Sequence, residues 1–132
     1  MKEYSGKCHC GSVKFTFQSE EEVEIWICNC SMCELLNYEH LFVRHEDFNL
    51  IIPDNNQSSD IVSTYQFGTR NAKHFFCKIC GIKTYYQPRS HPEAYSINRK
   101  SVLNPPNIKK LVHFDGKNFE QNIDNAKTIE NN

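Results

Sequence analysis

Short alternations of apolar and polar residues run along most of the chain and predict β-strands. Val13, Phe15 and Phe17 alternate with polar neighbours, and residues 23–27 repeat this pattern directly before Cys28. Further strand candidates are short, rich in β-branched and aromatic residues, and bounded by turn residues. They lie at residues 41–43, 48–52, 62–67, 74–77, 84–87, 94–98 and 111–114. The pattern therefore predicts a mainly β fold.

Polar and proline-containing segments separate these strands and predict loops or turns. They lie at Pro53–Asp60, Pro88–Pro92 and Asn104–Pro106. Residues 118–126 predict one short helix with Phe119 and Ile123 on one side, and the residues beyond Thr128 are expected to fray. Because the pattern contains no repeat and no linker, we expect a single domain over residues 1–132.

Composition and charge narrow the classes of function. Of 132 residues, 39% are hydrophobic and 23% are charged, which suits one folded globule. The net charge of −1 gives no electrostatic reason to expect binding to nucleic acid or to a membrane surface. No apolar stretch approaches the roughly 18 residues of a membrane span, and Met1 to Gly6 lack the apolar core of a signal peptide. We therefore expect an intracellular protein, cytoplasmic or nuclear, whose thiols stay reduced.

Cysteine is the unusual component, with seven residues in a small chain. The cysteines form an N-terminal pair (Cys8 and Cys10, before Gly11), a middle group (Cys28, Cys30 and Cys33) and a C-terminal pair (Cys77 and Cys80, before Gly81). Their odd number and the expected reducing compartment argue against a disulfide framework. Closely spaced cysteines can direct their sulfurs at one ion, and a following glycine lets the turn close with positive φ. Thiolate-rich tetrahedral sites suit zinc, with iron as the lesser choice.

Seven thiolates cannot fill two four-cysteine sites, so four plus three is the simplest division. The C-terminal pair needs two more ligands, which either the N-terminal pair or two cysteines of the middle group could supply. The middle group can hold an ion by itself and leave one position open, as catalytic zinc sites do. We therefore pair the N-terminal pair with the C-terminal pair, a choice that spacing alone supports only in part.

A histidine or an aspartate of this protein is the alternative fourth ligand for the middle group, and both sites would then be structural. His40 and His45 are the nearest histidines in sequence. Further candidates, which the fold could bring close in space, are His9, His74, His91 and His113.

The three cysteine groups, in the order C-x-C-G, C-x-C-x-x-C and C-x-x-C-G, resemble the glutathione-dependent formaldehyde-activating enzyme family. The likeness continues through Thr64–Phe67, His74–Gly81 and Tyr86–Ser90, and it spans about Gly6 to Ile129. Any one group alone is a weak signal, whereas the three in this order and separation are specific.

The resemblance implies one zinc-binding domain, of the type shared by formaldehyde-activating enzymes and centromere protein V. It implies a small, zinc-stabilised Mss4-like fold of short antiparallel strands, with two Zn²⁺ ions per chain. The N-terminal and C-terminal pairs would hold a structural ion, and the middle group a catalytic ion with an open coordination position. The implied activity is carbon–sulfur lyase chemistry on a small thiol, such as glutathione plus formaldehyde giving S-hydroxymethylglutathione.

A zinc-stabilised binding module without catalysis is the alternative function, because one fold serves many functions. Two residues differ from what the resemblance to this family leads us to expect. Asn29 stands where many bacterial members carry histidine, and Glu34 adds an acid where an anionic tripeptide would bind.

Arginine side chains are candidates for binding a substrate carboxylate with two hydrogen bonds. The candidates are Arg70, Arg89 and Arg99. Arg89 is the best of them because it follows Pro88 near the C-terminal pair, although exposed ion pairs are the commoner role of arginine. Trp26 precedes the middle group, and we expect it in the core or on the sheet surface, with a pocket wall as the alternative.

Overall fold

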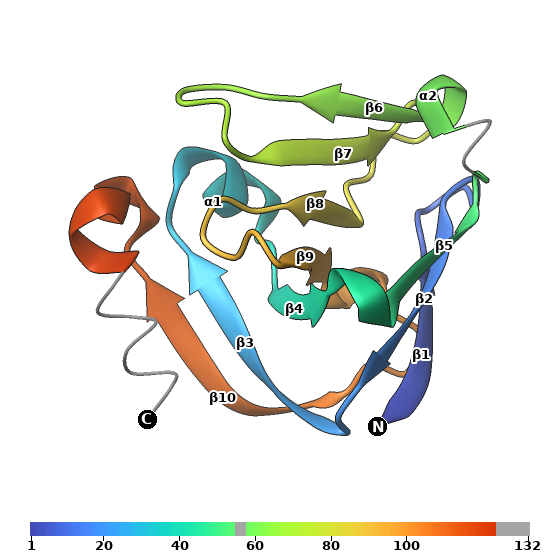
Figure 1. Cartoon of the computed structure of the whole chain (residues 1–132), viewed down its shortest axis with the longest axis horizontal. Coiled ribbons are helices and arrows are strands. Elements are labelled where there is room, and N and C mark those ends of the chain that lie inside the picture. Colours follow the sequence, from blue (N-terminus) through green and yellow to red (C-terminus); the bar gives the residue numbers. More distant parts are fainter. Residues whose placement is uncertain (55–57, 124–132) are drawn as a thin grey trace.

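Two β-sheets form most of the described structure, a computed structural model that covers residues 1–54 and 58–123 (Figure 1). The smaller sheet has the order β1-β2-β5 and consists of β1 (Lys2–Lys7), β2 (Lys14–Ser19) and β5 (Phe48–Ile52). The larger sheet has the order β10-β3-β4-β9-β8-β7-β6. Its strands are β3 (Glu22–Cys28), β4 (His40–Arg44), β6 (Val62–Tyr65), β7 (Lys73–Cys77), β8 (Tyr85–Gln87), β9 (Ala94–Asn98) and β10 (Asn107–Phe114).

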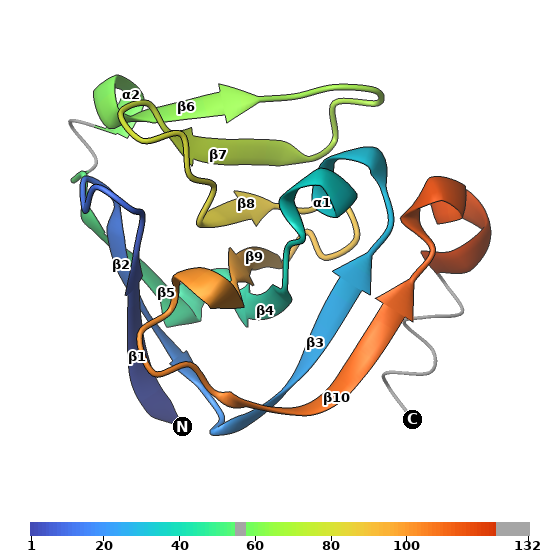
Figure 2. The same cartoon turned by 180° about the vertical axis from the view of Figure 1, so that it is seen from behind.

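The predicted mainly β fold of short antiparallel strands is confirmed, with one parallel pair added. β3 and β10 run side by side in the same direction, as Figure 2 shows from behind. Their register pairs Glu22 with Asn107 and Cys28 with Phe114. Because both strands end together, β10 brings the residues that follow it to the start of the middle group.

Helical segments are short and lie between or after the strands. They are α1 (Ser31–Leu36), α2 (Ser58–Ile61) and the 3-10 turns η1 (His45–Asp47), η2 (Arg99–Ser101) and η3 (Gly116–Asn118). Residues 119–123 are also helical, which confirms the predicted C-terminal helix as far as it is described. Residue 126 and the fraying expected beyond Thr128 lie outside the described residues. Within residues 1–54 and 58–123, no helix has the length and apolarity to cross a membrane.

Strand β1 has no counterpart among the strands that the sequence predicts. Its buried residues are Tyr4 and Gly6, so its apolar alternation is too weak to recognise. A Cβ atom on Gly6 would overlap the Phe15 ring and lie 2.8 Å from the Ser101 carbonyl oxygen. Glycine is therefore required where β1 passes close to the Phe15 ring. The reason is the close approach of the backbone, which leaves no hydrophobic pattern in the sequence.

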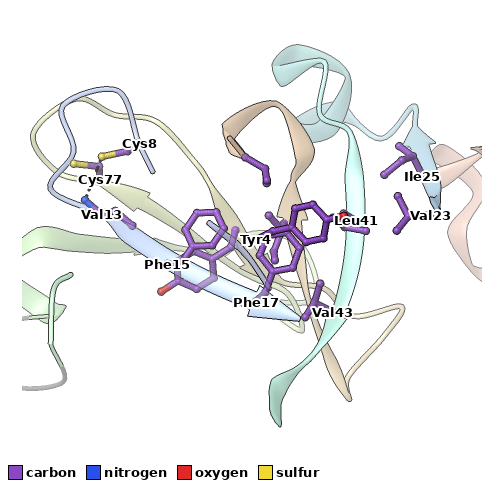
Figure 3. Packing of buried hydrophobic residues seen from close by; sticks show 13 residues of the cluster. Tyr4, Cys8, Val13, Phe15, Phe17, Val23, Ile25, Leu41, Val43 and Cys77 are labelled. Atoms are coloured by element: carbon purple, nitrogen blue, oxygen red, sulfur yellow. Dashed lines mark hydrogen bonds between the residues drawn. The ribbon is translucent and has the colours of Figure 1, made fainter. Parts of the chain in front are cut away.

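The alternation along each strand directs one face of the larger sheet towards the core. Ile25, Leu41 and Ile97 are buried on this face and belong to one core cluster with Phe15 and Phe17 of the smaller sheet, of which Figure 3 labels all but Ile97. Burial of each such side chain contributes about 1.5–3 kcal/mol to folding. The two sheets are therefore joined by side chains whose period-2 spacing is visible in the sequence.

The residues between these core positions face the opposite way. Trp26 and Cys28 of β3, His40 and Phe42 of β4, and Tyr86 of β8 all line one cavity. The same alternation that builds the core thus builds the wall of the candidate site on the other face.

Candidate metal centres and the adjoining cavity

The N-terminal and C-terminal pairs come together as a four-cysteine cluster. The sulfur atoms of Cys8, Cys10, Cys77 and Cys80 all lie within 4.8 Å of one another. The Cys10 sulfur is 3.7 Å from the sulfurs of both Cys8 and Cys77. A tetrahedral zinc site with zinc–sulfur bonds of about 2.3 Å has sulfur–sulfur edges of about 3.8 Å. The cluster therefore fits a zinc ion, and it confirms the predicted partnership between the two pairs.

Two similar turns shape the four-cysteine cluster. Gly11 and Gly81 have φ of 83° and 80°, which confirms the expected left-handed turn after each pair. The Gly11 N–H donates to the Cys8 carbonyl at 3.2 Å, and the Gly81 N–H donates to the Cys77 carbonyl at 2.8 Å. The backbone N–H of Val13 also donates to the Cys8 sulfur at 3.3 Å. These turns hold the two sulfurs of each pair close together.

The four-cysteine cluster is anchored in the core on one side and exposed on the other. Cys8 and Cys77 are buried, and Figure 3 shows their sulfurs side by side at the end of the core next to Val13. Burial raises the pKa of Cys8 to about 11, whereas hydrogen bonding to Ser12 lowers the pKa of exposed Cys10 to about 6. A cation is needed to stabilise all four thiolates together, as expected of a closed structural site.

The middle group lies where β3 leads into α1. Cys28 ends the strand, and Cys30 caps the helix by accepting a 3.5 Å hydrogen bond from the Cys33 N–H. The Cys30 N–H donates in turn to the Cys28 sulfur at 3.5 Å. The three sulfurs lie within 4.8 Å of one another. One turn of chain therefore gathers all three donors, as the spacing predicts.

No histidine, aspartate or glutamate of the described residues completes the middle group as a fourth ligand. His40 lies in the cavity wall with Nδ1 2.9 Å from the Ser96 hydroxyl, and a ring nitrogen of His45 is 2.6 Å from the Gln87 side-chain oxygen. Among the described residues the middle group therefore offers three sulfur donors.

Electrostatics of the middle group also fit a cation. Hydrogen bonds from the neighbouring thiols of Cys28 and Cys33 lower the pKa of Cys30, while hydrogen bonding to Cys28 and burial raise the pKa of Cys33. Without a cation, one thiolate is thus stabilised at the expense of the other two thiols. A divalent ion lets all three act as thiolate ligands, which is the donor set that soft-metal sites use.

The segment after β10 closes one side of the middle group. Asn29 donates from Nδ2 to Asp115 Oδ1 at 3.0 Å and accepts at Oδ1 from the Lys117 N–H at 3.1 Å. Gly116 lies between these contacts, and a Cβ atom there would overlap the Cys28 sulfur and lie 3.0 Å from Cys30 Cβ. Asn29 therefore ties down the segment that covers the site.

A cavity of about 440 Å³ adjoins the middle group, and Cys28, Cys30 and Cys33 form part of its wall. Most of the wall is apolar, and its aromatic members are Trp26, Phe42, Phe67, Tyr86, Phe114 and Phe119. Trp26 is buried as well as lining the cavity, so both of its predicted roles are combined. Apolar walls with a few polar groups are typical of small-molecule sites.

A buried lysine lies behind the cavity wall. Lys83 Nζ is 2.6 Å from His74 Nδ1 and 3.8 Å from the centre of the Tyr86 ring. Burial lowers the pKa of Lys83 to about 8, so this side chain is still charged in most molecules at neutral pH. Nothing in the local sequence marks Lys83 as a site residue, because a lysine between two strands gives no sign that the fold will bury it.

The candidate arginines differ in their surroundings. Arg99 is paired with Glu39 at 3.2 Å, and exposed Arg70 contacts Gln66 at 3.5 Å, so neither belongs to the cavity. Arg89 lines the cavity, lies 3.5 Å from the centre of the Phe119 ring and pairs with Glu120 at 3.1 Å. The structure thus places the preferred arginine, and only that one of the three, at the site.

Two comparisons place this arrangement among known proteins. The family model described as glutathione-dependent formaldehyde-activating enzyme matches residues 3–115, which include all seven cysteines. The crystal structure of a Rhodobacter sphaeroides protein is similar with a TM-score of 0.64 and 34% sequence identity. That similarity covers 74% of this chain and 85% of the other. The resemblance carried by the cysteine motifs is thereby confirmed.

Proposed function

Because the chain belongs to the glutathione-dependent formaldehyde-activating enzyme family, we propose that it is a zinc-dependent carbon–sulfur lyase. Its reaction joins a small thiol to formaldehyde, or reverses that addition, and glutathione would give S-hydroxymethylglutathione. One observation carries the proposal: three cysteines without a fourth protein ligand among the described residues form part of the wall of an aromatic cavity.

The seven cysteines divide between two roles in this proposal. The four-cysteine cluster would hold a structural zinc ion, and the middle group would hold a second one beside the cavity. When bound there, zinc with an open coordination position supplies a site that binds the substrate sulfur and favours its thiolate form.

The residues of the cavity do the remaining work. In the forward direction the thiol loses its proton, a sulfur–carbon bond forms, and the carbonyl π electrons move to oxygen, which takes up a proton. The aromatic walls exclude water from the reacting atoms, which strengthens every electrostatic interaction there. The charge of Lys83 offsets negative charge at the middle group, since each of the three cysteines acts to raise the pKa of this lysine.

Two cations at the cavity are suited to the carboxylates of glutathione. Arg89 and Lys117 both line it, and each is paired with a glutamate whose side chain is more than half exposed, Glu120 and Glu34 respectively. Such exposed ion pairs contribute little, roughly 0–1 kcal/mol. A substrate carboxylate can therefore replace either glutamate, so Glu34 does not prevent an anionic thiol from binding.

The test is to measure adduct formation with the zinc-loaded protein. Exchange NMR with ¹³C-formaldehyde and glutathione gives the rate of adduct formation with and without the chain, alongside zinc stoichiometry. We expect two zinc ions per chain and a saturable acceleration of the exchange. Calorimetry should show saturable glutathione binding.

Cys30→Ser is the matched control, because it removes one donor of the middle group and leaves the four-cysteine cluster intact. It should abolish the acceleration and keep the fold. A protein with two zinc ions that neither binds a thiol nor accelerates exchange would instead be the zinc-stabilised binding module.

A further inference from the structure

His40 is a buried polar residue of the cavity wall. Its side chain is 2% exposed, and it lines the same cavity as the middle group. Among the described residues, its Nε2 is the one buried side-chain nitrogen or oxygen without a hydrogen-bond partner. Leaving a buried polar group unpaired costs about 1–3 kcal/mol, so the position calls for a functional explanation.

The surroundings of His40 define which ring nitrogen carries the proton. Nδ1 lies 2.9 Å from the Ser96 hydroxyl and 3.2 Å from the Tyr86 hydroxyl. Nδ1 of His40 is therefore an acceptor that both hydroxyls can use. If Nδ1 accepts, one of the two hydroxyl hydrogens is satisfied, whereas if Nδ1 donates, both lose their acceptor. The favoured neutral tautomer therefore has its hydrogen on Nε2.

The ring stays neutral and fixed in place. Burial, with the nearby charge of Lys83 as a smaller cause, lowers the pKa of His40 to about 3. The ring packs 4.5 Å from the Tyr38 ring centre and 5.6 Å from that of Tyr86. Its Nε2–H is thus a preorganised neutral donor, which costs no reorganisation when charge develops nearby.

We propose that His40 is a catalytic residue whose Nε2–H donates a hydrogen bond to the oxygen of the aldehyde and of its thiol adduct. This inference rests on the proposed function and adds to it the group that stabilises the oxygen. As the thiolate sulfur bonds to carbon, the carbonyl π pair moves to oxygen. The alkoxide then takes up one proton, which balances the proton that the thiol lost, so His40 donates a hydrogen bond and transfers no proton.

This role also defines the class of substrate. A donor aimed at a carbonyl or hydroxymethyl oxygen favours thiol adducts of small aldehydes over simple thioethers, because a thioether has no oxygen to accept the bond. A site built to hydrogen-bond an oxygen discriminates strongly against an analogue that lacks it.

The test uses the zinc-loaded full chain with His40→Phe and His40→Gln. Phenylalanine keeps the ring packing without the N–H, and glutamine restores a donor. We expect His40→Phe to lower kcat for adduct exchange about 100-fold or more, to change KM for the thiol less than threefold, and to leave glutathione binding intact. His40→Gln should recover part of kcat.

His45→Phe is the matched control, since His45 lies outside the cavity lining, and it should leave kcat unchanged. If the wild-type chain accelerates exchange and folded His40→Phe does so equally well, the inference is overturned while the proposed function stands. If the wild type gives no acceleration, the proposed function is overturned, and the inference that rests on it falls with it.

Nitrogen-15 NMR of the wild-type histidines tests the inference without substitution. We expect the hydrogen of His40 on Nε2, and a change in that signal when the hydroxymethyl adduct is added. A proton on Nδ1, or no response to the adduct, would contradict the proposal even if His40→Phe does not fold.

Discussion

Lys83 donates a 2.6 Å hydrogen bond from Nζ to Nδ1 of His74, a residue of the cavity wall. Lys83 follows Cys80 by three residues and approaches the cavity from behind Tyr86. The chain that leaves the Cys77–Cys80 turn of the four-cysteine cluster thus places the positive charge of Lys83 near the middle group. The two cysteine sites are structurally connected through this short segment.

Replacement of Lys83 tests the role of that charge. A unit charge at several ångströms from the site is worth on the order of 1–2 kcal/mol at intermediate dielectric. We expect Lys83→Met to weaken glutathione binding to the zinc-loaded chain roughly tenfold, measured by calorimetry. Lys100→Met removes an exposed lysine as the control and should change the affinity little. Equal affinities in both variants would exclude the electrostatic role.

Gly116→Ala tests the closure of the middle group by the segment after β10. The added Cβ would overlap the Cys28 sulfur, so we expect zinc affinity at this site to fall about 10–100-fold, as for other groups packed around ligands. Competition with a colorimetric chelator measures it, and the four-cysteine cluster should retain its ion as internal control. Gly68→Ala places a Cβ that meets nothing within 4 Å; it carries only the local backbone strain of φ 58° and should retain both ions. If Gly116→Ala binds zinc at the middle group as tightly as the wild type does, the segment after β10 must be free to move away from the cysteines.

Cysteine-to-serine variants should separate the two sites by their effect on folding. Cys77 is buried in the core cluster, so Cys77→Ser should lose the structural ion and most of the cooperative thermal unfolding transition. Cys30→Ser should shift the transition by only a few degrees because its site lies on the other face of the sheet. Circular dichroism during heating measures both. Complete unfolding of Cys30→Ser would make the middle group structural.

Acid should destabilise the fold through His40. Its pKa is lowered from 6.5 to about 3 by burial, so the unfolded chain takes up this proton first as the pH falls. The stability linked to this group is complete above pH 6.5 and is lost progressively towards pH 3, by at most about 5 kcal/mol. Denaturant unfolding between pH 7 and 4 should show a steeper loss for the wild type than for His40→Phe. If the free energy of unfolding falls equally with pH in both proteins, His40 does not contribute to the acid sensitivity of the fold.

Several features were predictable because they depend on local spacing. Val23, Ile25 and Ile27 alternate, and the structure forms β3 there. Cys28, Cys30 and Cys33 span one turn, so their convergence needs no distant contact. The sequence does not predict strand β1, because Gly6 carries no side chain that could contribute to a hydrophobic period, although Phe15 packs directly over it.

The sequence by itself determined the mainly β pattern, the three cysteine groups and the family, since these are properties of order and spacing along the chain. The tertiary structure decided what depends on burial and on pairing between distant strands. It joined β10 to β3, covered the middle group with Gly116, and buried Lys83 and His40 beside the thiolates. Burial changes the charge state and hydrogen-bond needs of a side chain, and no local pattern records which polar residues a sheet will enclose.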